Sequence, residues 1–322
     1  MCSLIAARQT YADSTAHGLE SNFRHGEPDM KPNLLSTDKV IITVAITGGL
    51  HGKEANPNLP TSAEEQAQAA YDAYNAGASI VHIHVRDEQG INTPSLDYYN
   101  KTVRLIGERS PLIRQIGNGI GMRAKTPGAK PTSASLEERM NLLNITPRPE
   151  MMTVNAGSFE FRSPVGNDIF DNSLEFNRQF IDGCRTKGYG LELEVYDPSH
   201  IANMVELHER GVLESPMHFS IVLGIKGGAP ASVSNLTHMV SELPDDSGWQ
   251  VVTVGRYHFR SNAMALAMGG NVRTGMEDTV FIDKATPVTS NAQLVERMVA
   301  LARAMGREPA TVEEARAAVG IR

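Results

Sequence analysis

The stretch Val81-His82-Ile83-His84-Val85-Arg86-Asp87 carries the information that decides the expected fold and site of this chain. β-branched residues alternate with the histidines and predict a strand, which we place at residues 79–85. Alternate side chains of a strand share a face, so His82 and His84 lie roughly 6.6–7 Å apart along the backbone. Two imidazoles at this spacing can bind one metal ion, although a pair of buried, hydrogen-bonded histidines explains the pattern equally well.

Short apolar runs of the same kind alternate with helical segments along the rest of the chain. The clearest helix covers residues 62–76, where Ser62 and Glu65 form a capping box and Gly77 ends the helix. Eight strands separated by helices predict an α/β fold, the (β/α)8 or TIM barrel. The expected strands are residues 40–45, 79–85, 112–116, 151–155, 190–195, 218–223, 250–254 and 271–275. The further expected helices are residues 95–108, 135–143, 171–187, 201–209, 232–241 and 262–268.

A doubly wound sheet is the alternative fold. Its phosphate-binding fingerprint would be Gly117-Asn118-Gly119-Ile120-Gly121, which follows an expected strand. Pro127 and Pro131 interrupt the next stretch, and no clear acidic partner follows. The favoured organisation is therefore an N-terminal extension of residues 1–38, which shows little periodicity, and a TIM-barrel catalytic domain of residues 39–322.

Bulk composition indicates a soluble globular protein. The 322 residues are 41% hydrophobic and 21% charged, and the net charge of −7 argues against a general nucleic-acid-binding protein, which needs a basic face. No apolar run is long enough to span a membrane, and the N-terminus lacks the pattern of a signal peptide. Cys2 and Cys184 form neither a zinc motif nor a disulfide framework. We therefore expect a cytoplasmic protein without nucleic-acid or membrane partners.

Polar residues collect at the expected carboxyl ends of the strands, where a barrel places its active site. The end of the eighth strand is the stretch 272–278. Strands one and eight are neighbours in a closed barrel and strand two is next, so Glu277 can join the two histidines in a His2Glu metal site. Alternatively, Glu277 caps the following segment, and Arg273 and Asp278 form a surface ion pair.

Two other features suggest different chemistry. Lys226 lies in the glycine-rich stretch 224–228 after the expected sixth strand, where it can serve as a Schiff-base lysine, as in some barrel aldolases. Glu192 and Glu194 share a strand face and would shift each other's pKa. That pair indicates either a functional site or a structural network with arginines.

Eight stretches match motifs of one known family. They are residues 42–49 (ITVAITGG), 56–67 (NPNLPTSAEEQA), 76–87 (AGASIVHIHVRD), 149–161 (PEMMTVNAGSFEF), 191–197 (LELEVYD), 254–259 (VGRYHF), 268–281 (MGGNVRTGMEDTVF) and 290–307 (SNAQLVERMVALARAMGR). Together they resemble the β-keto acid cleavage enzymes, typified by 3-keto-5-aminohexanoate cleavage enzyme. The likeness covers nearly everything after Asp38.

The resemblance implies a TIM barrel that binds zinc through His82, His84 and Glu277. It also implies that a β-keto acid and acetyl-CoA condense, and that a retro-Claisen step releases acetoacetate and a new CoA ester. Zn²⁺ suits this chemistry, because a Lewis acid polarises the ketone. The other functions we consider are a Lys226 aldolase and a catalytically silent scaffold that binds CoA or metal.

The resemblance further implies catalytic roles for Arg273, Asp278 and Thr153. Arg273 would pair with developing negative charge, and Asp278 would orient Arg273 or relay a proton. By analogy with the family we expect a homo-oligomer, a tetramer, to which the polar N-terminal extension contributes. The residues expected to contact substrate are Leu50, Gly117, Asn118 and Asn155.

Two positions depart from the family pattern. Leu50 stands where members acting on the amino-bearing substrate carry a glutamate, and Gly117-Asn118 replaces a serine of the strand-three loop. Leucine cannot offset a buried cation, but it favours hydrocarbon by about 0.8 kcal/mol per buried CH₂. We therefore expect an uncharged or apolar substrate side chain near Leu50. The alternative is that another residue, such as Glu54, pairs with a cation.

Overall fold

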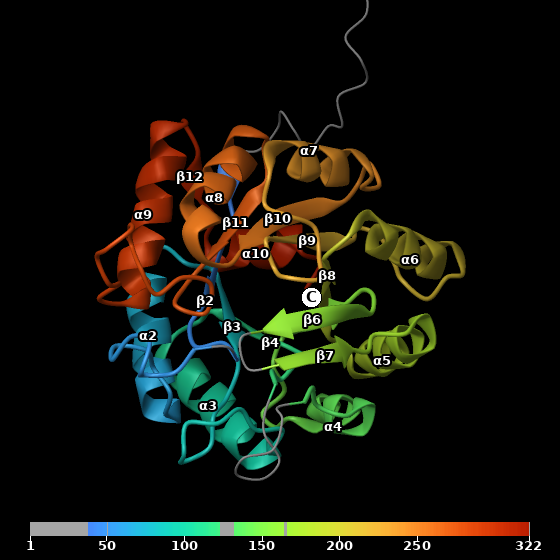
Figure 1. Ribbon diagram of the computed structural model, residues 1–322, viewed down its shortest axis with the longest axis horizontal. Coiled ribbons are helices and arrows are strands. Elements are labelled where there is room, and N and C mark those ends of the chain that lie inside the picture. The colour runs from blue at the N-terminus through green and yellow to red at the C-terminus, as the bar shows by residue number, and fades with distance from the viewer. Residues whose placement is uncertain (1–37, 50, 123–131, 164–165, 322) are drawn as a thin grey trace, which may run out of the picture.

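The computed structural model describes residues 38–49, 51–122, 132–163 and 166–321. Within them, eight parallel strands close a barrel in the order β10-β11-β2-β3-β4-β5-β8-β9, and helices surround it (Figure 1). The predicted TIM barrel is therefore confirmed, and the open, doubly wound sheet is excluded. The barrel strands are β2 (Ile42–Ala45), β3 (Ile80–Ile83), β4 (Ile113–Ile116), β5 (Met151–Asn155), β8 (Gly190–Val195), β9 (His218–Leu223), β10 (Gly248–Thr253) and β11 (Asn271–Thr274).

Most of the helices begin at a side-chain cap. Ser62 and Glu65 form the expected capping box of α2. α5 begins later than expected because Ser173 caps it. α6 begins earlier, because Asp197 is the cap and Pro198 fits the first turn. The helices around the barrel are α2 (Ala63–Ala76), α3 (Leu96–Arg109), α4 (Leu136–Asn141), α5 (Leu174–Lys187), α6 (Pro198–Glu209), α7 (Val233–Ser241), α8 (His258–Ala267) and α9 (Asn291–Ala304).

Several elements were not anticipated from the sequence. α9 completes the ring of helices, and an antiparallel hairpin after β5 crosses in front of the barrel in Figure 1. Among the described residues, no helix is long and apolar enough to cross a membrane. The other unanticipated elements are β1 (Lys39–Val40), the hairpin strands β6 (Phe159–Ser163) and β7 (Gly166–Phe170), β12 (Glu308–Pro309), the short helices η2 (Leu142–Asn144) and η3 (Gly255–Tyr257), and α10 (Val312–Ala318).

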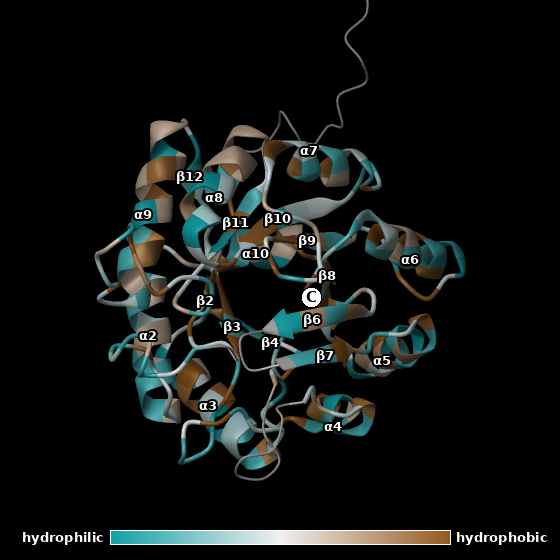
Figure 2. Cartoon of the chain, in the orientation of Figure 1, coloured by the Kyte–Doolittle hydropathy of each residue, from teal (hydrophilic) through white to brown (hydrophobic). Residues whose placement is uncertain are grey.

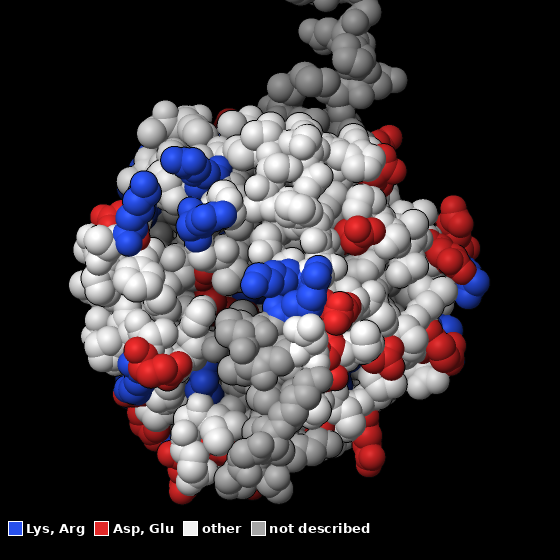
Figure 3. All heavy atoms as spheres, in the orientation of Figure 1, with Lys and Arg blue, Asp and Glu red and all other residues white. Residues whose placement is uncertain are grey.

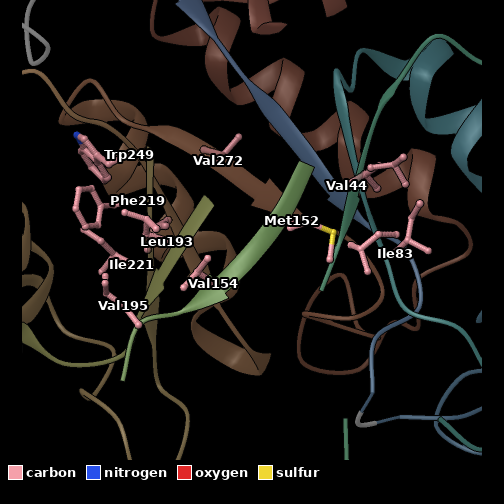
Figure 4. Packing of buried hydrophobic residues seen from close by; sticks show 14 of the residues in the cluster. Val44, Ile83, Met152, Val154, Leu193, Val195, Phe219, Ile221, Trp249 and Val272 are labelled. Carbon is pink, nitrogen blue, oxygen red and sulfur yellow. The ribbon is translucent and has the colours of Figure 1, made fainter. Parts of the chain in front are cut away.

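The alternation of strand side chains separates the core from the site. Leu193 and Val195 of β8 pair in register with Phe219 and Ile221 of β9, and these side chains pack in the hydrophobic core (Figure 4). The residues between them in the sequence, such as Glu194, point to the opposite face, into the barrel. Figure 2 shows hydrophobic residues on the central strands, and a mixture of hydrophilic and hydrophobic residues on the β6–β7 hairpin.

The floor of the barrel below β2, β3, β4 and β5 is apolar. A separate hydrophobic cluster joins the first inward-facing residues of four strands to α10, which covers this end. The amino-terminal ends of β2, β3, β4 and β5 are thereby covered, whereas cavities beside His218 remain at this end of the barrel. The cluster contains Ile41, Ile80, Ile113, Met151, Ala310, Val312, Ala315 and Val319.

Candidate active site

Two histidines and a glutamate meet at the carboxyl ends of β3 and β11. His82 belongs to β3, His84 follows on the same face, and Glu277 lies just after β11. The Nε2 atoms of the two rings are 3.1 Å apart, and Oε1 of Glu277 lies 3.7 Å and 3.8 Å from them. β11 pairs with β2 and β2 pairs with β3, so closure of the barrel brings the three side chains together.

The surroundings of these side chains fit a divalent ion. An added Cβ at Gly117 would lie 2.6 Å from Nε2 of His84 and 2.9 Å from Nε2 of His82. At Gly48, whose φ is +66°, a Cβ would lie 2.4 Å from Cγ of Glu277, so glycine is required at both positions. Oε2 of Glu277 is buried without a hydrogen-bond partner in the described residues. The donor set is two imidazole nitrogens and a carboxylate whose Oε1 pairs with Arg273 and whose Oε2 is unpaired, and such a set is suited to zinc.

Gln115 fixes the tautomer of His82. The register of β3 and β4 places the two residues opposite each other, and Oε1 of Gln115 lies 2.7 Å from Nδ1 of His82. The side-chain carbonyl oxygen of Gln115 can only accept a hydrogen bond, so this contact requires a proton on Nδ1 of His82. His82 therefore carries its proton on Nδ1 and directs the Nε2 lone pair toward the metal position.

Arg273 lies among three carboxyl groups. It donates to both oxygens of Asp278, at 3.2 Å and 3.1 Å, to Glu194 at 3.2 Å and to Glu277 at 2.6 Å. Arg273 and Asp278 are buried, so their ion pair is not on the surface. The Glu277 and Asp278 carboxylates together carry more negative charge than Arg273 offsets, which favours a divalent ion beside Glu277.

A hydrogen-bond chain continues from Arg273 through Glu194. The Tyr196 hydroxyl lies 2.6 Å from Oδ1 of Asn155 and 3.3 Å from Oε2 of Glu194. One hydroxyl proton cannot serve two acceptors, so both contacts are satisfied when the Glu194 carboxyl is protonated and donates. Burial raises the pKa of Glu194 to about 7, which agrees with this arrangement.

The remaining expected residues differ in their access to the pocket. Gly117 and Asn155 line it. Asn118 and Thr153 are buried behind it. The side-chain amide of Asn155 donates to Oδ1 of Asn118. The backbone N–H of Asn118 in turn donates to Oγ1 of Thr153 at 3.2 Å. Leu50 lies outside the described residues. Among the described residues, Thr153 is thus connected to the site through Asn118. The roles assigned to all these residues stay predictions.

The pocket above the metal position has one polar and one apolar wall. The polar wall is formed by the histidines and the groups around Arg273, and the apolar wall comes from β9, β10 and the hairpin. Lys226 is exposed and does not line the pocket, so it lacks the enclosed surroundings that activate a Schiff-base lysine. The apolar wall contains Phe161, Phe170, Val222, Ile225, Val252 and Val254.

The site contains residues that the sequence analysis missed. Gln115 lies in no motif, although it faces inward on its strand. Tyr196 lies in the motif of residues 191–197, directly after the last residue of β8, but was assigned no role. The expected pairing of Glu194 with an arginine is present, and its partner is Arg273, from a distant part of the chain. Together, fold and site define a TIM-barrel enzyme with a candidate metal site at the mouth.

Comparison with known proteins specifies this class. The profile of the beta-keto acid cleavage enzyme family matches residues 39–321. The chain is 37% identical over 287 residues to the 3-keto-5-aminohexanoate cleavage enzyme of Acetoanaerobium sticklandii, covering 88% of this chain and 99% of that relative. It is 32% identical over 292 residues to the 3-oxoadipate:acetyl-CoA acetyltransferase of Cupriavidus necator, covering 88% and 96%. The chain therefore belongs to the β-keto acid cleavage enzyme family, which confirms the resemblance and the expected class of carbon–carbon-cleaving transferase.

Solved structures share the fold. Apo ObcA superposes with a TM-score of 0.66 at 19% identity, covering 82% of this chain and 66% of that chain. The ternary complex of ObcA with a C4-CoA adduct and oxalate gives the same TM-score and identity and covers 82% and 68%. At this identity the likeness concerns the barrel alone.

Proposed function

We propose that this protein is a zinc-dependent enzyme that condenses a β-keto acid with acetyl-CoA and releases acetoacetate and a new acyl-CoA. The observation that carries the proposal is the convergence of His82, His84 and Glu277 beside the buried Arg273 cluster, at the mouth of the barrel. Family membership and the acetyl-CoA transferases among the relatives support the same reaction.

The three ligands would hold Zn²⁺, which supplies a Lewis acid that polarises the ketone of the substrate. The protein's own groups then act on a proton. Burial raises the pKa of Asp278 to about 6, so at neutral pH this carboxylate is ionised yet basic enough to accept a proton. Arg273 holds both oxygens of Asp278 in place and provides positive charge next to the enolate that forms.

The proposed reaction of a β-keto acid begins with the loss of a proton and ends with its return. Asp278 takes a proton from the carbon between the ketone and the carboxylate, and that carbon attacks the thioester carbonyl of acetyl-CoA. The CoA thiolate leaves, attacks the original ketone and becomes the new thioester when the carbon–carbon bond breaks. The departing carbon recovers the proton from Asp278, which gives acetoacetate and leaves the enzyme unchanged.

Buried polar groups position this machinery. Glu194 in its protonated form and Tyr196 place hydroxyl groups on the pocket wall beside Arg273. We assign Thr153 a positioning role, since it holds the Asn118 backbone at the start of the glycine-rich loop. Gly117 and Asn155 would contact the substrate directly. Asn118 would act indirectly, by holding the Asn155 side chain.

We also propose that the substrate side chain is uncharged or apolar. The acidic groups of the pocket already pair with Arg273, and the opposite wall is hydrocarbon. Glu54 does not line the pocket, and its carboxylate accepts from the Gly52 backbone at 2.7 Å. Leu50→Glu should shift preference from straight-chain β-keto acids toward amino-bearing ones without changing zinc content. A wild type that prefers cationic substrates would overturn the idea.

The proposed reaction is tested by screening β-keto acids with acetyl-CoA for acetoacetate release, with metal content measured on the same preparation. Turnover that resists chelators, together with borohydride trapping at Lys226, would favour the aldolase instead. Binding of acetyl-CoA without turnover of any keto acid would favour the silent scaffold.

Assembly and location complete the proposal. We expect a cytoplasmic homotetramer in which residues 1–38 support assembly and residues 39–322 carry catalysis. Deletion of the residues before Lys39 should weaken the tetramer in sedimentation while zinc content is kept. A wild-type monomer at micromolar concentration would contradict it.

A further inference from the structure

Three basic side chains stand at the rim of the pocket, directly beyond its apolar wall. Arg162 follows the pocket-lining Phe161 and Lys226 follows Ile225. Arg256 lies just beyond Val254, which also lines the pocket. All three are exposed. We call Arg162, Lys226 and Arg256 the basic rim.

The hairpin and the β9 loop hold two members of the basic rim side by side. The backbone N–H of Arg162 donates to the carbonyl of Lys226 at 3.3 Å. Gly227, with φ of +111°, packs so closely that an added Cβ would lie 2.0 Å from the carbonyl oxygen of Glu160. The two segments are thus fixed against each other, and their cations project from one surface. Figure 3 shows Lys and Arg side chains gathered over β6, with a second group over α8.

These cations are at most weakly neutralised by the described part of the protein. In the part of the chain that the structure describes, no ion pair of Lys226 is found, and the closest carboxylate oxygen to Arg162 is that of Glu160 at 3.9 Å. Arg256 contacts the Tyr257 hydroxyl and ring, which are uncharged. Lys226 and Arg256, together with Arg162 and its single long, exposed ion pair, are suited to attract an anion even on a chain of net charge −7.

The apolar wall connects this rim to the reacting groups. Val222 and Val252 lie deep in the pocket, and Ile225 and Val254 continue the same wall toward the rim. An extended, largely uncharged arm can lie along this wall with one end at Arg273 and the other among the cations. Acetyl-CoA has this form: a thioester at one end, a pantetheine arm, and a nucleotide with three phosphate groups at the other end.

We propose that the basic rim binds the phosphate groups of the CoA nucleotide, and that the apolar wall of β9 and β10 seats the pantetheine arm. The inference rests on the proposed function, which names acetyl-CoA as co-substrate. It gives Lys226 an anion-binding role, in place of the Schiff-base chemistry considered for its glycine-rich motif. Neighbouring arginine and lysine side chains bind phosphate groups through charge-assisted hydrogen bonds.

The test uses calorimetry on the full-length, zinc-loaded protein with three probes: acetyl-CoA, adenosine 3′,5′-bisphosphate as the nucleotide part, and S-acetylpantetheine as the arm. Lys226→Ala combined with Arg162→Ala should weaken binding of acetyl-CoA and of the bisphosphate about tenfold or more. Binding of S-acetylpantetheine should not change. Lys226→Arg should keep most of the affinity, because it retains the charge.

Arg210→Ala is the matched control, since it removes an exposed arginine at the end of α6, away from the mouth. It should leave all three affinities as in the wild type. Unchanged acetyl-CoA affinity in the double variant, or an equal loss for S-acetylpantetheine, overturns the subsite. If no β-keto acid is turned over but the variants still lose acetyl-CoA affinity selectively, the proposed reaction fails and the subsite stands.

Discussion

The two ends of the barrel interior are built from opposite chemistry. At the floor, inward-facing Ile80 and Ile113 meet α10 in a buried apolar cluster. At the mouth, the same two strands carry His82 and Gln115, which lie beside Arg273 and its carboxyl partners. Within one strand, the floor residue therefore contributes to stability and the mouth residue contributes to chemistry. Floor substitutions should therefore change folding, and mouth substitutions should change metal binding and turnover.

The largest expected effect is at the metal ligands. His82→Ala removes one of three donors, so we expect loss of stoichiometric zinc and a drop in turnover of about a thousandfold or more. Metal analysis and acetoacetate release on the same preparations measure both. His238→Ala, an exposed histidine on α7, is the control and should keep full zinc. Full zinc occupancy in His82→Ala would disprove the ligand assignment.

The second prediction concerns the floor. Ile80→Ala leaves a cavity against α10 in a fully buried cluster, which should lower the free energy of unfolding by about 2–5 kcal/mol. The zinc content and kcat of the folded fraction should remain those of the wild type. Urea unfolding followed by circular dichroism gives the stability. The separation of layers fails if kcat falls tenfold while the variant is still folded.

The third prediction addresses the boundary between the layers. Gln115→Leu removes the hydrogen-bond acceptor that fixes the His82 tautomer, so zinc affinity should fall about 10- to 100-fold. Competition with a chelator measures the affinity without reference to turnover. Gln115→Glu keeps an acceptor at this position and should retain more affinity than the leucine variant. Equal affinity of wild type and Gln115→Leu would show that Gln115 does not orient the ligand.

The sequence predicted the features that depend on near neighbours. All eight barrel strands follow from β-branched and apolar runs, and the capping box at Ser62 was visible because its two residues are close in sequence. The shared face of His82 and His84 follows from strand periodicity, and Glu277 could be added because barrel closure fixes the strand order. The start of α9 could also be predicted, because Ser290 and Gln293, three positions apart, have the pattern of a helix cap. We interpreted this stretch only as a family motif.

The rest depends on contacts between distant residues. Arg273 contacts Glu194 across 79 positions of sequence, and the Tyr196 hydroxyl reaches Asn155 across 41. Only the register of the barrel strands sets such distances. The Glu192 and Glu194 pair could therefore indicate a network with arginines, but not which arginine takes part. Thr153 shows the same limit: the motif places it on β5, but only the packing reveals that it supports a loop instead of lining the pocket.

The smallest expected effect is a pH dependence at the mouth, caused by Glu194. Burial raises its pKa from the ordinary value of 4.5 to about 7, so the folded state binds this proton more tightly than the unfolded state. Stability from this group is fully present below about pH 4.5 and is lost as pH rises toward about 7, with a slope of up to about 1.4 kcal/mol per pH unit. In the metal-free protein, Glu194→Gln mimics the protonated form and should remove this part of the slope. Glu160→Gln, an exposed control on β6, should unfold with the wild-type pH profile. If Glu194→Gln keeps the wild-type slope between about pH 5 and about pH 7, Glu194 is not the protonated donor to Tyr196.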